Sequence, residues 1–421
     1  MANTANTRGT LVLHGGALCD HFYGTVRRTA GVDKPRLAVF LSAHSSFKEA
    51  HESFFQTYCP RFSAWGFEPV FVPVAVDHYT TIAHDESYAN LVKSCQAVFL
   101  GGGSQANHAR SLLDDDGSLT PVAQAIKYVY EHGGVVAGNS AGTHVISNPM
   151  YSDGSSYEAM CANAIEPRSI RDVPARVDPI ISKNNISLPG LGLVNSDILL
   201  CTHHDARGRL GRLIVGVRDL RARYGVGIDE ETTLVLAPHA HIRAGAEDLR
   251  SLGGLIGEVV GYCGVFIVEV IPETVYAPAG RAGSFGVSNL RLHYLTEGDR
   301  FDFSSRQVIP GPDKRKVAHS READAFEIDD IFSQGEAKYR VTRAIVTLAN
   351  SGVGRVDALV SPPGGPVENG PAFRVTISKD DKTEVYASGE PYGESRSARH
   401  LEGLKKVTAS STRVDVIPIL K

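Results

Sequence analysis

The chain has 421 residues, of which 42% are hydrophobic and 21% are charged, an ordinary balance for a globular protein that can bury a sizeable core. The length favours one large α/β unit with a smaller appendage, or two domains, and the composition excludes disordered and fibrous proteins. With 43 basic and 47 acidic residues the formal charge is −4, so no overall positive field draws the chain to nucleic acid or anionic lipid. We therefore predict neither a nucleic-acid nor a membrane partner.

The first residues and the cysteines bear on the compartment. Met1 to Arg8 show no apolar stretch behind a basic cluster, and apolar runs such as Val265 to Ile271 are too short to cross a membrane. Six cysteines are widely spaced without a Cys-x-x-Cys pair, which signals neither a disulfide framework nor a zinc cluster. We predict a cytoplasmic protein with free thiols, and we expect no metal and no cofactor.

Six short apolar runs, rich in β-branched residues, alternate with stretches long enough for a helix through the first part of the chain. This spacing is typical of the buried strands of a parallel sheet with helices on both faces. We therefore predict a doubly wound, mostly parallel α/β sheet, whose ligands lie beyond the carboxyl ends of the strands. The runs are Thr10 to His14, Arg36 to Leu41, Phe67 to Val74, Gln96 to Leu100, Gly134 to Ala137 and Ile198 to Thr202.

After Leu252 the strand-like runs become closely spaced, at 258–262, 265–270 and 287–294, and a polar, basic stretch from Pro310 to Asp324 follows. Such a stretch is typical of a linker or a long surface connection. We therefore divide the chain into a main domain, 1–309, and a C-terminal region, 310–421. A helix over 338–350 and strands over 372–377, 383–387 and 413–419 predict a smaller α+β region, in which we identify no catalytic cluster.

The segment Gly138-Asn139-Ser140-Ala141-Gly142 contains Gly-x-Ser-x-Gly between a predicted strand and a predicted helix. In this context the serine lies on a tight turn with its hydroxyl exposed at the carboxyl edge of the sheet, as a nucleophile requires. The same residues also fit an ordinary strand-to-helix turn with a capping serine. The segment alone does not choose between the two interpretations.

Three glycines, Gly101 to Gly103, follow the predicted strand 96–100. Their N–H groups can face a ligand without obstruction, as an oxyanion hole, a phosphate cradle or only a turn. The patterns of phosphate-binding loops are absent, which disfavours the cradle. With Ser140 as nucleophile, the N–H groups of Gly103 and Ala141 are predicted to converge on one oxygen.

The strand 198–202 ends in His203 and His204, and three arginines follow it. A histidine there can act as a base, and guanidinium groups can bind carboxylates. Neighbouring strand residues face opposite ways, so at most one of the two histidines meets Ser140. Each residue type also has a purely structural interpretation. The histidine can be a hydrogen-bonded polar residue at the end of a strand, and the arginines can lie on a solvated helix face and pair with carboxylates. The arginines are Arg207, Arg209 and Arg212.

Taken in order, Gly-Gly-x-Gln, Gly-x-Ser-Ala-Gly, a strand ending in His before Arg-Gly-Arg-x-Gly-Arg-Leu, and Gly225-Val-Gly-Ile-Asp-Glu230 resemble the cyanophycinases. This serine peptidase family also holds the aspartyl dipeptidases and has a glutamine-amidotransferase-like α/β fold. The resemblance runs from about Gly9 to Phe303. It implies a peptidase whose substrate is a peptide of the polyaspartate type, and it implies a homodimer.

Carried over residue by residue, the resemblance implies that Ser140 is the nucleophile and His203 its general base, because the spacing to the arginine run matches at 203 and not at 204. It points to Glu158 as the acid that orients the imidazole. From the residues alone, Asp153 or Asp205 would serve as well. Positions matching the substrate-binding residues of the family are Gln105, Arg207, Arg209 and Arg212.

The sequence departs from the family pattern at two places. Members that act on cyanophycin carry Asp-Gln before the catalytic histidine and Gly-Gly-Asp-Gln in the earlier loop, whereas this chain has Cys201-Thr202 and, in the loop, Ser104-Gln105. Cyanophycin carries arginine on the β-carboxyls of polyaspartate, and pocket carboxylates would pair with that guanidinium. We expect Ser104 and Thr202 to face the substrate there. The arginine-bearing substrate is therefore less well supported than the hydrolytic chemistry.

We predict a serine peptidase that hydrolyses aspartate-rich peptide, with cyanophycin as the first candidate and an acyl-enzyme as intermediate. Three alternatives stay open. One is a dipeptidase or isopeptidase for other Asp-containing peptides. Another is a catalytically silent relative that binds a carboxylate ligand or a partner protein. The third is a metal hydrolase that uses His239 and His241, which lack an evident acidic partner.

Overall fold

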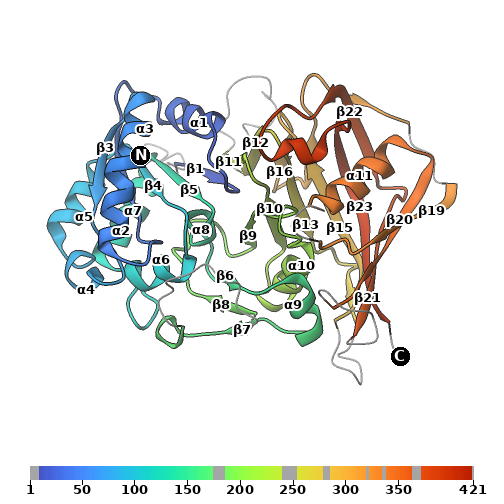
Figure 1. The fold of residues 1–421 in the computed structure, drawn as a ribbon, viewed down its shortest axis with the longest axis horizontal. Coiled ribbons are helices and arrows are strands. Elements are labelled where there is room, and N and C mark those ends of the chain that lie inside the picture. Colours follow the sequence, from blue (N-terminus) through green and yellow to red (C-terminus); the bar gives the residue numbers. More distant parts are fainter. Residues whose placement is uncertain are drawn as a thin grey trace, which may run out of the picture.

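The computed structural model describes residues 9–173, 185–238, 254–277, 285–318, 322–333, 338–362 and 371–419. Two large β-sheets lie side by side in these ranges. Figure 1 shows the N-terminal strands and helices on the left and the C-terminal strands on the right. A small third sheet consists of β6 (Met150–Asp153), β7 (Glu166–Pro167) and β8 (Ile186–Leu188).

The first sheet has nine described strands in the order β17-β16-β12-β11-β1-β5-β4-β2-β3. The five strands from β1 to β3 are parallel, and the remaining four extend the sheet from β1 by antiparallel pairs. The predicted α/β class with a large, mostly parallel core is confirmed. The strands are β1 (Thr10–His14), β2 (Arg36–Phe40), β3 (Glu68–Val72), β4 (Ala97–Leu100), β5 (Val135–Asn139), β11 (Thr232–Pro238), β12 (Leu255–Gly261), β16 (Arg300–Asp302) and β17 (Gln307–Ile309).

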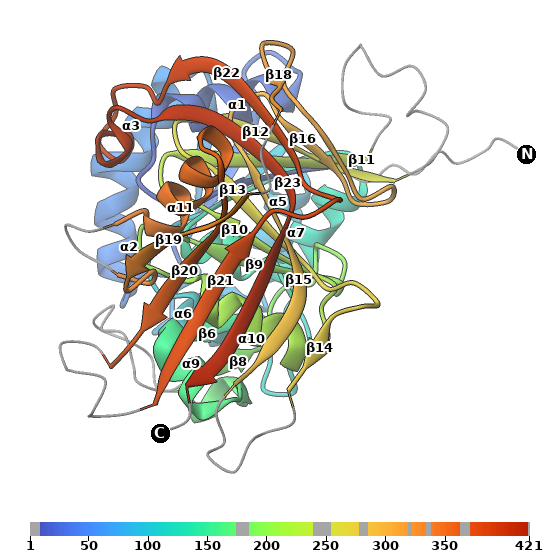
Figure 2. The same cartoon turned by 90° about the vertical axis from the view of Figure 1, so that its right-hand side faces the viewer.

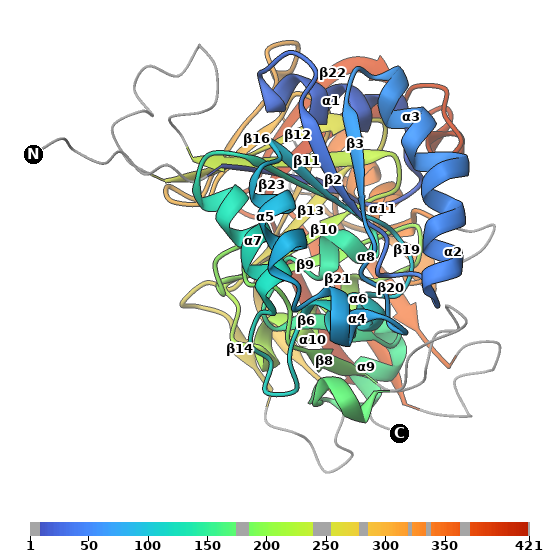
Figure 3. The same cartoon turned by 90° about the vertical axis from the view of Figure 1, so that its left-hand side faces the viewer.

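Helices cover both faces of the parallel strands, because successive strand residues point to opposite faces. On β1, Leu11 and Leu13 pack into the core beneath α5, α6 and α7, whereas Val12 packs with α1 and α3. Figure 3 shows α5 and α7 on one side of β2 and β3, and α2 and α3 on the other. The helices are α1 (Asp20–Ala30), α2 (Phe47–Ser53), α3 (Cys59–Ala64), α4 (Tyr79–Ile82), α5 (Glu86–Lys93), α6 (Gln105–Leu112), α7 (Pro121–Glu131), α8 (Ala141–His144), α9 (Ser156–Ala162), α10 (Leu210–Asp219) and α11 (Arg340–Asn350).

The second sheet follows the order β19-β20-β21-β23-β15-β13-β10-β9, with β14, β18 and β22 attached beside this path. Its core contains α9, α10 and α11. Figure 2 shows β20, β21, β23 and β15 running side by side across the face of the molecule. The strands are β9 (Ile198–Thr202), β10 (Tyr224–Ile228), β13 (Val265–Glu269), β14 (Val275–Tyr276), β15 (Val287–Leu295), β18 (Arg315–Lys316), β19 (Glu322–Asp329), β20 (Val353–Val360), β21 (Ala372–Ser378), β22 (Glu384–Pro391) and β23 (Lys405–Ile419).

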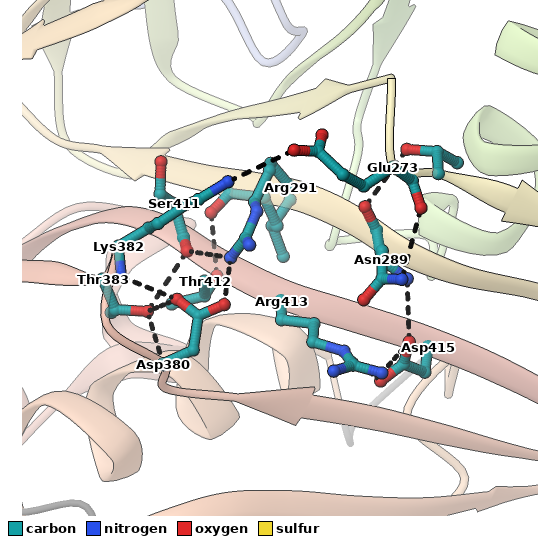
Figure 4. Close-up of polar contacts among 12 residues, drawn as sticks. Glu273, Asn289, Arg291, Asp380, Lys382, Thr383, Ser411, Thr412, Arg413 and Asp415 are labelled. Carbon is teal, nitrogen blue, oxygen red and sulfur yellow. Dashed lines mark hydrogen bonds and ion pairs between the residues drawn. The ribbon is translucent and has the colours of Figure 1, made fainter. Parts of the chain in front are cut away.

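Polar side-chain contacts join the C-terminal strands to β15, in addition to the backbone hydrogen bonds between β15 and β23 (Figure 4). Arg291 of β15 donates to Asp380 Oδ2 at 2.6 Å and to the carbonyl oxygen of Ser411 at 3.1 Å. The backbone N–H of Asn289 donates to Asp415 of β23 at 2.9 Å. The region after residue 310 is therefore built onto the second sheet. The boundary at 310 stays a prediction.

Two expectations on the elements need correction. The run Ile198–Thr202 forms β9 as predicted, but in the second sheet, where it pairs with β10, because the edge of β1 is taken by β11. The basic stretch after Pro310 is not only a connection: Arg315–Lys316 forms β18, which pairs with β22. Apolar runs indicate strands but not their neighbours. In the part of the chain that the structure describes, no helix combines the length and apolar character needed to cross a bilayer.

Candidate active site

Ser140 lies on a sharp turn between β5 and α8. Its backbone has φ 53° and ψ −109°, a conformation that non-glycine residues rarely adopt and that is typical of strained functional turns. The turn is held because the N–H of Ser140 donates to the carbonyl oxygen of His14 at 3.0 Å, and the hydroxyl of Thr143 donates to the same oxygen at 2.9 Å. This is the strand-turn-helix geometry expected of a nucleophile elbow.

The two glycines of the motif let α8 approach the sheet closely. A Cβ at Gly138 would lie 2.7 Å from the backbone of Gly142, and a Cβ at Gly142 would lie 2.0 Å from the carbonyl oxygen of Leu100. No side chain fits at either position without moving backbone. The glycines therefore set the position of Ser140 relative to β4 and β5.

The predicted contact between Ser140 and His203 is present. Ser140 Oγ lies 2.8 Å from His203 Nε2, within hydrogen-bond distance. His203 follows the last residue of β9, and its N–H donates to the carbonyl oxygen of Gly15 at 2.9 Å. A Cβ at Gly16 would lie 2.1 Å from the imidazole. The loop after β1 therefore supports the ring from behind.

Glu230 occupies the other nitrogen of the ring. Its Oε1 lies 2.8 Å from His203 Nδ1, and its Oε2 accepts a hydrogen bond from the hydroxyl of Ser397 at 3.2 Å. The strand pairing explains the position: β9 and β10 are parallel with Thr202 opposite Ile228, so the residues that follow the two strands are neighbours. Ser140, His203 and Glu230 form a continuous hydrogen-bonded chain.

The prediction that Glu158 orients the imidazole is corrected by this geometry. Glu158 is the third residue of α9, and its carboxylate accepts from the N–H and the hydroxyl of Ser155, at 3.2 and 2.9 Å. These contacts form a capping box, a common device at helix N-termini. Glu230 ends one of the motifs that carry the family resemblance, but no role for it was predicted. The sequence did contain a signal: the acidic pair Asp229-Glu230 comes directly after an apolar run that can form a strand beside the strand of His203.

Burial and charge set the protonation of this pair. Burial lowers the pKa of His203 from its ordinary value of 6.5 to about 4, and the hydrogen bond that its imidazole donates to Glu230 opposes this only in part. Burial alone would raise the pKa of Glu230, but its hydrogen bond with His203 and the charges of His203 and Lys338 lower that pKa to about 2. At neutral pH the imidazole is therefore free to accept a proton from Ser140.

We expect peptidase activity to survive mild acid. Since a neutral imidazole is the base and its pKa is about 4, kcat/KM should stay level from about pH 8 to about pH 5 and fall about tenfold per pH unit below about pH 4. The measurement is kcat/KM across this range, with samples returned to neutral pH to exclude acid unfolding. A half-maximal point near the ordinary histidine pKa would contradict the assigned environment of His203.

The second histidine of the pair faces away from the serine. His204 is fully buried, and its ring lies 4.9 Å from that of Phe266. Burial lowers its pKa to about 3. The predicted opposite orientation of the two histidines holds, and His204 serves the core of the second sheet.

The glycine loop after β4 lies beside the serine. A Cβ at Gly102 would lie 3.7 Å from Ser140 Cβ, and Gly103 has φ 139° with its Cβ position 2.7 Å from the carbonyl oxygen of Ala43. Ala141 is the first residue of α8, where helix N–H groups lack intrahelical partners. The structure thus places Gly102 beside Ser140 and Ala141 directly after it; the convergence of the N–H groups of Gly103 and Ala141 on one oxygen stays a prediction.

The predicted substrate arginines differ in their surroundings. Arg207 lines a cavity together with His203 and Glu230. Arg209 donates to the carbonyl oxygen of Thr202 at 2.7 Å. Arg212 is only 2% exposed, and it donates to the carbonyl oxygen of Gly154 at 2.9 Å. Arg209 and Arg212 are thus engaged within the fold, and contact of their guanidinium groups with substrate stays a prediction.

The remaining predicted contacts lie near the same edge. The side-chain amide of Gln105 donates to the carbonyl oxygen of Ser152. Ser104 caps α6 by accepting from the N–H of Asn107 at 3.4 Å. The Thr202 hydroxyl is buried without a hydrogen-bond partner. Thr202 is fully buried, and its predicted contact with substrate stays a prediction.

The described ranges contain no group of three or more His, Cys, Asp or Glu side chains placed to hold a metal ion. His239 and His241, the candidates for a metal hydrolase, lie outside the described residues. All six cysteines are free thiols in the structure.

Comparison with known proteins gives related peptidases. No family model matches the sequence. A cyanophycinase from Geminocystis herdmanii is 27% identical over 230 residues, which cover 54% of this chain and 70% of that protein. A cyanophycinase from Trichormus variabilis is 31% identical over 222 residues, which cover 52% of this chain and 61% of that protein. The similarity thus spans about half of this chain and does not span the whole length of either relative.

Solved structures show a looser likeness. A peptidase from an acI-B1 Actinobacterium aligns with a TM-score of 0.48 and 19% identity, covering 71% of this chain and 98% of that one. A putative peptidase E protein from Listeria monocytogenes EGD-e aligns with a TM-score of 0.33 and 11% identity, covering 54% and 94%. The sequence matches carry the comparison: this chain is similar to curated cyanophycinases, and this similarity supports a hydrolase of the peptidase class.

Proposed function

We propose that this protein is a serine peptidase that hydrolyses aspartate-rich peptide, with cyanophycin, cleaved to β-Asp-Arg dipeptides, as the first candidate substrate. The observation that carries the proposal is the hydrogen-bonded chain from Ser140 Oγ through the imidazole of His203 to Glu230, with 2.8 Å at each step. A hydroxyl, a base and an orienting carboxylate in this order are the working parts of serine peptidases on unrelated folds.

The reaction proceeds by acyl transfer. Ser140 Oγ attacks the carbonyl carbon while His203 Nε2 takes its proton, and the negative oxygen is held by N–H groups of Gly103 and Ala141. The imidazolium, stabilised by Glu230, then gives the proton to the leaving amine, and the C–N bond breaks. Water, deprotonated by the same imidazole, attacks the ester and releases the acid with regeneration of Ser140.

A second candidate is a dipeptidase or isopeptidase for other Asp-containing peptides. It is favoured by the absence of carboxylates at Ser104, Cys201 and Thr202, which removes partners for the guanidinium group of cyanophycin. The arginines of the site suit substrate carboxylates in either case, because their forked donors match a carboxylate.

The test is incubation of the full chain with cyanophycin and, separately, with a panel of aspartyl dipeptides. We expect β-Asp-Arg to be released from cyanophycin and to be absent from a parallel sample of Ser140→Ala protein. Cleavage of the dipeptides alone would favour the second candidate. If no peptide is cleaved and an active-site serine reagent does not label Ser140, the result would favour the alternative that this protein is a catalytically silent relative of the peptidases.

A further inference from the structure

A cavity of about 310 Å³ lies against the catalytic histidine and its carboxylate. Its walls come from two parts of the chain that are far apart in sequence. The site itself supplies Ala17, His203, Arg207 and Glu230, and the C-terminal region supplies Lys338, Arg396, Ser397, Arg399 and His400. The C-terminal residues lie outside the stretch that resembles the cyanophycinases, so this wall is a feature that the family likeness does not account for.

The cavity is strongly cationic. It is lined by three guanidinium groups and one ammonium group, from Arg207, Lys338, Arg396 and Arg399, against one carboxylate, that of Glu230. Glu230 is already engaged by His203 and Ser397. Glu230 interacts electrostatically with Arg207 and Lys338. The fold has therefore gathered four cations in one hollow against a single carboxylate.

The four cations repel one another, although solvent screens this repulsion in part because Arg396 and Arg399 are exposed. The same arrangement focuses a positive potential on anything that enters. The effect extends to His400: burial and the nearby cations Lys338 and Arg399 lower its pKa. An anionic group that binds in the cavity would relieve this repulsion.

Hydrogen bonds hold the cationic wall in place. Glu231, next to the catalytic carboxylate, accepts from the hydroxyl of Ser395 and from the N–H of Ser397, both at 2.7 Å. These bonds fix the segment that carries Arg396 and Arg399.

The segment that carries Lys338 is fixed in the same way. Asp205, two residues after the catalytic histidine, accepts from the N–H groups of Val341 and Thr342, at 3.2 and 2.7 Å, at the start of α11. Both anchors are acidic residues beside the catalytic machinery, so the cations are presented to the site by a preformed scaffold.

We propose that this cavity is a subsite for carboxylate groups of an acidic peptide substrate, with Lys338, Arg396 and Arg399 of the C-terminal region as specificity-determining residues. The inference rests on the proposed function in that the bound peptide is the one cleaved at Ser140. His203 lies both in the cavity wall and at 2.8 Å from Ser140 Oγ, so the cavity adjoins the serine across the width of one imidazole ring. Free carboxylates, not amides, are the groups that this wall selects.

The test measures binding without turnover, in the full chain carrying Ser140→Ala. Tetra-aspartate and tetra-asparagine are titrated calorimetrically at low salt. We expect tetra-aspartate to bind at least about tenfold more tightly, and its affinity to fall as salt rises, since partly exposed charges are screened. Adding Arg396→Gln and Arg399→Gln, both exposed positions, should weaken tetra-aspartate by about tenfold and leave tetra-asparagine within about twofold. Lys338→Gln, made separately, should act in the same direction.

The control is Arg374→Gln at an exposed position of β21, which removes one positive charge away from the cavity and should leave both affinities unchanged. Equal binding of the two peptides, or unchanged tetra-aspartate affinity in the double variant, would overturn the subsite. Failure of the proposed function is seen separately. If protein with intact Ser140 binds tetra-aspartate selectively but cleaves no peptide, the subsite is supported and the proposed peptidase function is not. If it cleaves peptide without selective binding, the peptidase function is supported and the subsite is not.

Discussion

Replacing Ser140 by alanine is expected to lower peptidase kcat by about 10⁶-fold, the order found when a serine nucleophile is removed from a serine protease. The reason is that in the proposed mechanism Ser140 Oγ is the atom that attacks, and without it His203, which lies 2.8 Å away, has no proton to accept. The backbone at Ser140 has positive φ, and alanine and serine tolerate that conformation about equally. The fold should therefore survive, with an unchanged melting temperature. The measurement is steady-state hydrolysis together with thermal unfolding.

The control for this substitution is Ser94→Ala. Ser94 is an exposed serine at the end of α5, and its loss should change neither activity nor fold. Hydrolysis by Ser140→Ala protein at more than a trace of the parent rate would remove the nucleophile assignment. Such a result would also mean that the hydrogen bond between Ser140 and His203 has only a structural role.

Exchanging a carboxylate for an amide at Glu230 is expected to lower kcat/KM by about 10⁴-fold, the order seen when the acid of a serine-histidine-acid triad becomes an amide. Glu230 Oε1 accepts from His203 Nδ1 and thereby leaves Nε2 free to take the proton of Ser140. An amide that donates to Nδ1 selects the other tautomer, in which Nε2 carries hydrogen and cannot act as base. The loss should fall on the chemical step, with the fold retained.

Glu158→Gln is the matched control, since it makes the same chemical change at the acid expected from the family likeness. Glutamine still forms a capping box, so we expect activity within about twofold of the parent and a stability change below about 1 kcal/mol. The pair of variants separates the two carboxylates in one assay. A large loss of activity in Glu158→Gln, with little effect in Glu230→Gln, would show that Glu158 and not Glu230 orients the imidazole.

The contrast between Ser140 and Glu230 shows how far local sequence carries the site. Ser140 is predictable because its requirements are local: a strand, a tight turn, and glycines at Gly138 and Gly142 that allow helix and strand to touch. Glu230 depends on the pairing of β9 with β10, which no short segment encodes. Glu158 was suggested by likeness to a family, and its own neighbours instead form a helix cap.

The same division applies to the C-terminal region. Its strands could be predicted from their apolar runs, but their place could not, because β23 pairs with β15 across more than a hundred residues of chain. The cationic wall at Arg396 and Arg399 was not predicted for the same reason. Scattered arginines in a polar segment are usually a solvated surface, and only the anchoring of that segment by Glu231 brings them to His203.

By itself the sequence determined the α/β class, most strands of the parallel sheet, and the serine and histidine of the site, because hydrophobic periodicity and turn chemistry act over a few residues. Tertiary structure decided which sheet receives β9, which carboxylate meets the imidazole, and that residues of the last part of the chain line a cavity against His203. Those outcomes depend on contacts between residues far apart in sequence, whose partners are chosen by the packing of the whole chain and not by any segment of it.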